Sequence, residues 1–220
     1  MAGVDLRLVV SQAGFELRTM LSNGEQLLLN LALPLAGLAM LRQQAETDRL
    51  GQLVLYGAVF ASNFTGTAIA TAFERRQGSL KAFAVTPLGK TGLVLAKSGA
   101  GAALATTQLA VLLLLAHGFS ISLAWSAANW LAAIALAAAA QAWALWLAAQ
   151  VRAEAVLAVA NGGLIFAVFF AYQFPNQSAV LAVNPVASAA QIANSDSAWL
   201  LLIGQAMVGI AAASRQFRWD

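Results

Sequence analysis

Residues 124–150 read AWSAANWLAAIALAAAAQAWALWLAAQ and carry no charged side chain. A helix of about 20 largely apolar residues crosses the roughly 30 Å of hydrocarbon in a bilayer. Alanine is the best helix former, and small side chains let membrane helices pack closely. This stretch therefore predicts a membrane-spanning helix in a tight bundle.

The composition of the whole chain agrees with this prediction. Of 220 residues, 60% are hydrophobic and only 10% are charged, whereas a soluble domain has roughly a quarter of its residues charged. The chain has no Cys and a single His, His117, so disulfides, thiolate catalysis and Cys-ligated metals are excluded, and we expect no metal site. The small net charge of +3 bears on membrane orientation rather than on nucleic-acid binding.

We expect an all-α, polytopic membrane domain over residues 1–220 with six spans. In addition to 124–150, the apolar stretches that predict spans are 22–41, 50–73, 92–116, 153–174 and 198–213. Pro34 falls inside the first span, where a neighbouring group must satisfy the carbonyl that proline leaves free.

Residues 4–21 predict an amphipathic helix at the membrane surface. The apolar face holds Leu6, Val10, Ala13, Leu17 and Met20; the opposite side holds Arg7, Ser11 and Arg18, flanked by Asp5, Gln12 and Glu16. An ordinary helix packed against protein is the alternative.

Most Lys and Arg residues gather on one predicted side of the membrane: at the N-terminus, at 74–97, at 151–154 and at the C-terminus. The other side has only Arg42 and Arg49. By the positive-inside rule, both termini are expected in the cytoplasm.

Residues 74–91 form a long connection on the predicted cytoplasmic side. Ser79 can cap a short helix that Pro87 ends, and Leu80, Phe83 and Ala84 then share one face. We expect Leu80 and Phe83 to be exposed, which invites a partner protein. The alternative is a helix folded back onto lipid headgroups.

This region resembles the signature of ABC-2 type transporter permeases. The resemblance lies in Phe73-Glu74, Gly78-Ser79-Leu80, Thr86-Pro87 and Leu95-Ala96-Lys97, and it extends to the plan of one amphipathic helix, six spans and an outer excursion. It implies that Glu74, Gly78, Ser79, Leu80, Phe83 and Pro87 belong to a coupling helix that contacts an ATP-binding cassette subunit. By the same resemblance, ATP and Mg are bound by that partner, and this chain binds no cofactor.

Residues 175–197 mix polar and apolar side chains and are expected to dip into the outer leaflet while packed against protein. Asn184-Pro185 should break this extracellular excursion into two pieces. Residues 198–220 then supply the sixth span and a cytoplasmic tail.

Polar and aromatic side chains within two spans are candidates for a substrate pathway, because the resemblance places these spans at the centre of a dimer. They are Phe60, Asn63, Phe64 and Thr67 in the second span and Asn161, Phe166, Phe169 and Phe170 in the fifth. Each polar member could instead hydrogen-bond between helices, the role that we assign to Gln108, Gln141 and Gln205.

The spans have no charge near mid-depth, and Lys97 is expected to reach the cytoplasmic interface by snorkelling. A carrier driven by ions would need a buried carboxylate, so a separate energy source is favoured. Residues 84–91 only approximate a phosphate-binding loop, because Ala84 replaces its first Gly. With no catalytic constellation, we expect a transport subunit rather than an enzyme.

The sequence therefore predicts a permease subunit of an ABC exporter in the cytoplasmic membrane, dimeric with a second copy or a homologous permease. Its substrate is expected to be hydrophobic or amphipathic. A haem-exporter-like permease of cytochrome c maturation and a non-transporting membrane scaffold are the alternatives.

Overall fold

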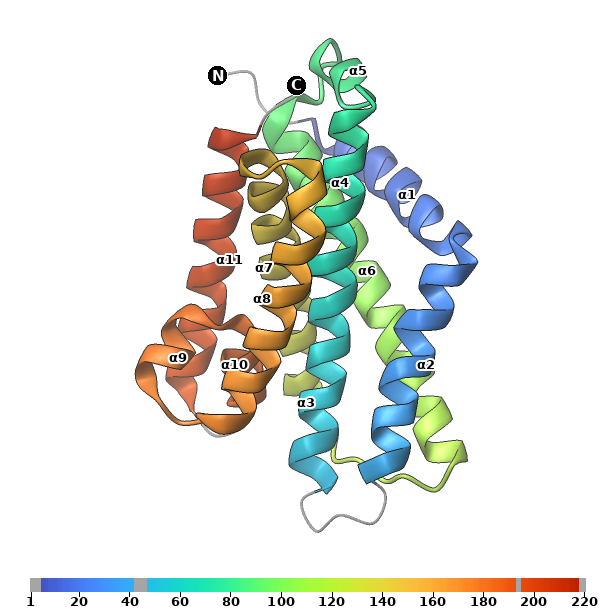
Figure 1. Ribbon diagram of the computed structural model, residues 1–220, viewed down its shortest axis with the longest axis vertical. Coiled ribbons are helices and arrows are strands. Elements are labelled where there is room, and N and C mark those ends of the chain that lie inside the picture. Colours follow the sequence, from blue (N-terminus) through green and yellow to red (C-terminus); the bar gives the residue numbers. More distant parts are fainter. Residues whose placement is uncertain (1–4, 42–46, 193–194, 218–220) are drawn as a thin grey trace.

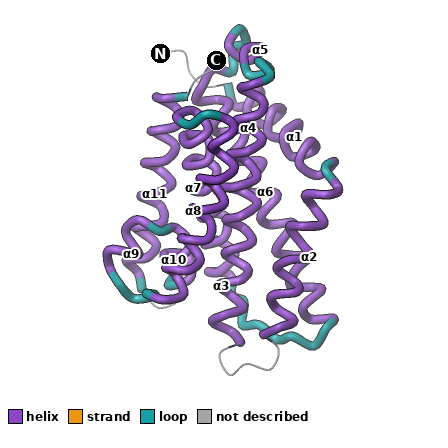
Figure 2. Tube along the Cα trace, in the orientation of Figure 1, coloured by secondary structure: helices purple, strands orange, loops and turns teal. Residues whose placement is uncertain are grey.

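The bundle is built entirely from helices over the residues that the computed structural model describes, 5–41, 47–192 and 195–217 (Figures 1 and 2). The elements are α1 (Leu6–Ser22), α2 (Gly24–Leu41), α3 (Thr47–Phe60), the π-helix η1 (Ala61–Gly66), α4 (Thr67–Arg76), α5 (Lys81–Ala84), α6 (Gly89–Gly118), α7 (Ala127–Gln150), α8 (Ala153–Gln173), α9 (Ser178–Val183), α10 (Pro185–Ala190) and α11 (Asp196–Gln216).

Five helical segments of the described chain are long and apolar enough to cross a membrane. They are Asp48–Arg76, which joins α3, η1 and α4, and the four helices Gly89–Gly118, Ala127–Gln150, Ala153–Gln173 and Asp196–Gln216. The all-helical class is thereby confirmed, and five of the six predicted spans coincide with helices that could cross a membrane. The first predicted span coincides with α2, whose described apolar part, Asn30–Leu41, is shorter than these five segments.

Helix α7 lies at the centre of the bundle and contacts α11, α6, α4, α3, α10 and α8. Its alanines, including Ala137, Ala140 and Ala144, are fully buried, so neighbouring backbones approach closely without large side chains between them. The helix begins at Ala127, later than predicted, because Ser126 and Asn129 form a reciprocal capping box.

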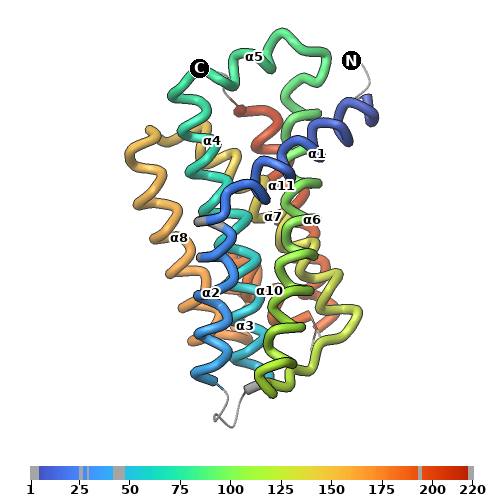
Figure 3. Tube along the Cα trace, turned by 90° about the vertical axis from the view of Figure 1, so that its right-hand side faces the viewer, coloured from blue at the N-terminus to red at the C-terminus, as the bar shows by residue number. Residues whose placement is uncertain are grey.

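Helix α1 crosses one end of the bundle at an angle and rests on α6 (Figure 3). The start of α1, the end of α11 and the short helix α5 lie at this same end, which we call the α5 end (Figure 1). Exposed basic residues there are Arg76, Lys81, Arg152 and Arg215. Arg49 lies near the start of α3, at the opposite end of the bundle. Arg42 and Arg218, which were also counted for the orientation, lie outside the described residues.

The segment between α8 and α11 folds as two short helices, which confirms the predicted break at Asn184-Pro185. The Asn184 side-chain oxygen accepts hydrogen bonds from the backbone N–H groups of Val186 and Ala187, and its Nδ2 donates to the Ala167 carbonyl of α8 at 2.8 Å. Helix α10 is buried against α8, α11, α3 and α7. The segment is therefore packed into the bundle, as its mixed polarity predicted.

Gly78 ends α4, and this corrects the prediction that Ser79 caps a new helix. Gly78 has a φ of +77°; its N–H donates to the Arg75 carbonyl, and the Ser79 N–H donates to the Glu74 carbonyl. These two bonds define a Schellman motif, which needs a left-handed residue such as glycine. Ser79 therefore lies in the turn, and α5 is a single helical turn that ends before Pro87.

Candidate functional site

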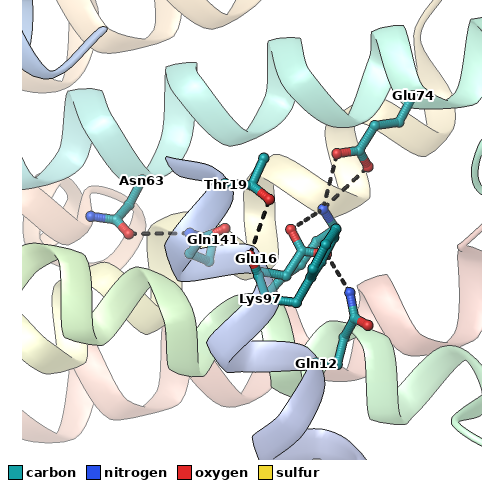
Figure 4. A network of polar contacts seen from close by, with 8 residues as sticks. Gln12, Glu16, Thr19, Asn63, Glu74, Lys97 and Gln141 are labelled. Carbon is teal, nitrogen blue, oxygen red and sulfur yellow. Dashed lines mark hydrogen bonds and ion pairs between the residues drawn. The ribbon is translucent and has the colours of Figure 1, made fainter. Parts of the chain in front are cut away.

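Lys97 of α6 lies between two carboxylates from other helices (Figure 4). Its Nζ is 2.9 Å from Glu16 Oε2 on α1 and 3.2 Å from Glu74 Oε2 on α4, and the Lys97 side chain is 2% exposed. We call these three residues the ionic triad. The prediction that Lys97 snorkels to the interface is wrong, because the two carboxylates satisfy its charge inside the bundle.

Glu16 is held in place by its own helix as well as by Lys97. Gln12 Nε2 donates to Glu16 Oε1 at 2.9 Å, and Val9 and Glu16 are the buried residues of α1. Leu6 and Val10 of the predicted apolar face are exposed, whereas Ala13, Leu17 and Met20 are half-buried, so the bundle covers only part of that face. Helical periodicity alone could not show that Glu16 is buried, because its partner Lys97 is 81 residues away along the chain.

A second cluster of polar side chains, which we call the amide network, joins four helices deeper in the bundle. Gln141 Nε2 of α7 donates to Asn63 Oδ1 at 3.2 Å, and Ser62 Oγ donates to Gln108 Oε1 at 2.9 Å. A Cβ at Gly101 of α6 would lie 2.2 Å from Gln141 Nε2 and 2.4 Å from Asn63 Oδ1. A larger residue at 101 would therefore displace the Gln141–Asn63 hydrogen bond, and glycine lets α6 approach this network.

The amide network also provides a hydrogen-bond donor for the carbonyl group that the proline in α2 leaves free. Pro34 has no N–H to donate to the carbonyl of Asn30, four residues earlier. Gln108 Nε2 donates to that carbonyl at 2.9 Å. The predicted need for a neighbouring donor is thus met by α6, and Gln108 connects the proline site of α2 to the π-helix η1, in which Ser62 and Asn63 lie.

The segment between α4 and α6 is anchored to the bundle through Leu80. Leu80 is 1% exposed and packs with Leu93, Val94, Leu145, Ala213 and Phe217. The expectation that Leu80 is exposed is wrong, because the Schellman turn directs the chain back over the ends of α6, α7 and α11. Phe83 is half-buried against the same cluster, whereas Lys81, Pro87 and Val85, which is 88% exposed, face outward.

Arg75 also ties this segment to the bundle. Its guanidinium donates to the carbonyls of Ala148 and Val151 at the end of α7, where helix carbonyls lack partners within the helix. Arg76 forms an ion pair with Glu154 of α8 at 3.2 Å. The predicted coupling region is thus connected to α7 and α8 as well as to α6.

Two apolar grooves lie on either side of α8. The first, of about 650 Å³, is lined by Phe60, Phe64, Phe166 and Phe170 together with Trp143, Trp146 and residues of α9 and α10. The second, of about 670 Å³, lies between α2, α3 and α8 and includes Phe169. All five candidate pathway phenylalanines therefore line a groove.

The polar pathway candidates lie elsewhere. Asn63 is fully buried in the amide network, which matches the interhelical alternative for this residue. Thr67, four residues later, is also buried, but its hydroxyl has no hydrogen-bond partner among the described residues. Asn161 is exposed on α8. Gln205 donates to the carbonyls of Leu181 and Ala182, so Gln108, Gln141 and Gln205 all hydrogen-bond between elements, as expected.

The fold and these contacts define an all-helical protein with several membrane-compatible helices, a buried ionic cluster and apolar grooves. Comparison with known proteins adds no identification. The sequence matches no family model, and no curated protein matches it.

Proposed function

We propose that this chain is the membrane-spanning permease subunit of an ABC exporter in the cytoplasmic membrane, driven by ATP hydrolysis in a separate ATP-binding cassette subunit. The observation that carries the proposal is the anchoring of the 74–88 segment. Its outer side presents Lys81 and Val85, and its inner side inserts Leu80 between α6, α7 and α11. A partner that pushes on this turn moves three helices directly.

The ionic triad supports the same role. Glu74 lies in the last turn before Gly78, and Lys97 connects it to Glu16 of α1. Motion of the 74–88 segment is therefore transmitted to α1, the proposed interfacial helix. In this proposal the α5 end, with its exposed basic residues, faces the cytoplasm, in accordance with the positive-inside rule.

In this topology α2 also crosses the membrane, which brings the number of crossings to six. The start of α1 and the end of α11 lie at one end of the bundle (Figure 1), which requires an even number of crossings. An 18-residue helix such as α2 falls within the range of about 17–25 residues that a spanning helix needs.

The substrate proposal rests on the first groove. Aromatic side chains from α3, η1, α7 and α8 line it, and Asn184, its polar residue, already uses both its side-chain oxygen and nitrogen in hydrogen bonds. Such a lining suits a hydrophobic or amphipathic molecule. In an export cycle, α9 and α10 would close the outer end of this path.

The function is tested by Val85→Glu in a tagged chain purified from its host in mild detergent. We expect loss of a co-purifying ATPase subunit, because a carboxylate is placed on the proposed contact surface. The matched control is Val183→Glu, the same substitution at an exposed site on α9, which should leave the ATPase bound. If the unsubstituted chain purifies without any ATPase, the exporter proposal fails and a membrane scaffold is favoured.

A further inference from the structure

Seven buried side-chain atoms lack a hydrogen-bond partner among the described residues. Four of them belong to residues of α4, α6 and α7, and we call these four residues the polar seam. The atoms are Thr67 Oγ1, Thr71 Oγ1, Ser98 Oγ and Gln141 Oε1, none of which has a partner among the described residues. Each of these residues is more than nine-tenths buried. A buried polar atom without a partner is costly, so each of these atoms calls for an occupant that can hydrogen-bond.

The polar seam extends from the amide network, to which Gln141 belongs, toward the ionic triad. Ser62 contacts Gln108 and Glu74 contacts Lys97, so α6 runs antiparallel to residues 62–74. Thr67 and Thr71 follow Asn63 at four-residue spacing toward Glu74, on one side of the helix. Ser98 lies on α6 between Lys97 and Gly101, whose Cα closely faces Asn63 and Gln141.

Another side of the same helix is apolar. Ala68 and Ala72, the residues next to the two threonines, are fully buried against Ala144, Ala148 and Val156. Thr67 and Thr71 therefore lie on a different side of α4 from Ala68 and Ala72, which pack against α7 and α8.

We propose that the polar seam holds internal water molecules. A buried water makes about three hydrogen bonds to polar groups that would otherwise be unsatisfied, and hydroxyl groups can both donate and accept such bonds. Water enters from the α5 end past Glu74, whose side chain is 34% exposed. The inference does not depend on the proposed transport function.

Infrared spectroscopy of single-cysteine variants tests the proposal, because the chain has no native Cys. Thr67→Cys, Thr71→Cys and Ser98→Cys each place one thiol in the polar seam; Ala68→Cys and Ala72→Cys place it on the apolar side. After transfer into D2O, we expect seam thiols to convert from S–H to S–D within minutes and to show an S–H stretch lowered by hydrogen bonding. The alanine-site thiols should keep their S–H band at least ten times longer.

Two results would overturn the proposal: seam thiols that exchange as slowly as the alanine-site thiols, or equally rapid exchange at all five sites. The first means a dry seam, and the second means general opening of the bundle. Only variants that elute with the parent protein in gel filtration are compared, and the three seam positions provide independent measurements.

Discussion

The ammonium of Lys97 is the single positive charge of the ionic triad, and it faces two carboxylates. Removing one partner of a buried charged cluster leaves the others without compensation, which is costlier than the net worth of the pairs themselves. Loss of Lys97 therefore leaves both carboxylates without a cation, whereas loss of either carboxylate leaves Lys97 with the other one.

We predict that Lys97→Met destabilises the protein by about 3–5 kcal/mol, because both carboxylates lose their cation. Glu16→Gln should cost less, since Lys97 keeps Glu74 and the amide can still accept a hydrogen bond. Thermal unfolding in detergent, followed by tryptophan fluorescence, measures both. Equal costs for the two variants would show that Glu16 carries the whole interaction.

Residue environments were the least predictable feature of the sequence. Leu80 was expected at the surface and Lys97 at the interface, yet both are buried by partners that are remote in sequence, Ala213 and Glu16 respectively. Local spacing identifies which residues share a face of a helix. It does not identify which neighbouring element covers that face.

At the scale of elements, α2 and the α3–η1–α4 segment each contain an irregular site, and Gln108 contacts both. Its Nε2 satisfies the carbonyl that Pro34 leaves free, and its Oε1 accepts from Ser62 in the π-helix. A helix in a membrane bundle can keep a backbone group without a partner in its own helix where a neighbouring group hydrogen-bonds to it. Gln108 supplies that group at Pro34, and at the π-helix it contacts the side chain of Ser62.

We predict that Gln108→Leu destabilises the bundle by about 1–3 kcal/mol, the cost of leaving buried polar groups unpaired. In a Pro34→Ala background the penalty should shrink, because residue 34 then supplies an N–H to the Asn30 carbonyl. A double-mutant cycle on unfolding free energies measures this coupling. Strict additivity would mean that the Gln108–Asn30 hydrogen bond contributes nothing to stability.

The helices themselves were largely predictable from the sequence. Apolar stretches of span length placed α6, α7, α8 and α11 to within a few residues, and Asn184-Pro185 placed the boundary between α9 and α10. The π-helix was not predicted, because an apolar, continuous helical pattern carries no signal for one extra residue in a turn. Gly78 was misread because glycine followed by serine fits both a helix end and a helix start.

At the scale of the whole molecule, α8 is the most exposed of the long apolar helices. Ile165, Phe166 and Phe169 are exposed, and Asn161 adds an exposed amide on the same helix. An amide at membrane depth favours association with another helix, and neighbouring small residues such as Gly162 permit close approach. These features favour α8 against α8 of a second copy as the interface of the dimer that the sequence predicts.

We predict that Asn161→Cys forms a crosslinked dimer with a short bis-maleimide in native membranes, because the two α8 helices would bring the thiols together. Leu200→Cys, at a residue that is 74% exposed on α11, is the matched control and should remain monomeric. Denaturing gels separate the two outcomes. Monomers only at position 161, or equal crosslinking at position 200, would contradict an α8 interface.

The ionic triad also dictates an order of biosynthesis. Glu16 and Lys97 are 81 residues apart, so at roughly 5–20 residues per second a ribosome delivers Lys97 roughly 4–16 s after Glu16. During that interval the carboxylate has no ammonium to pair with, and α1 cannot take its final place. Docking of α1 is therefore a late event that waits for α6, although α1 is made before α6.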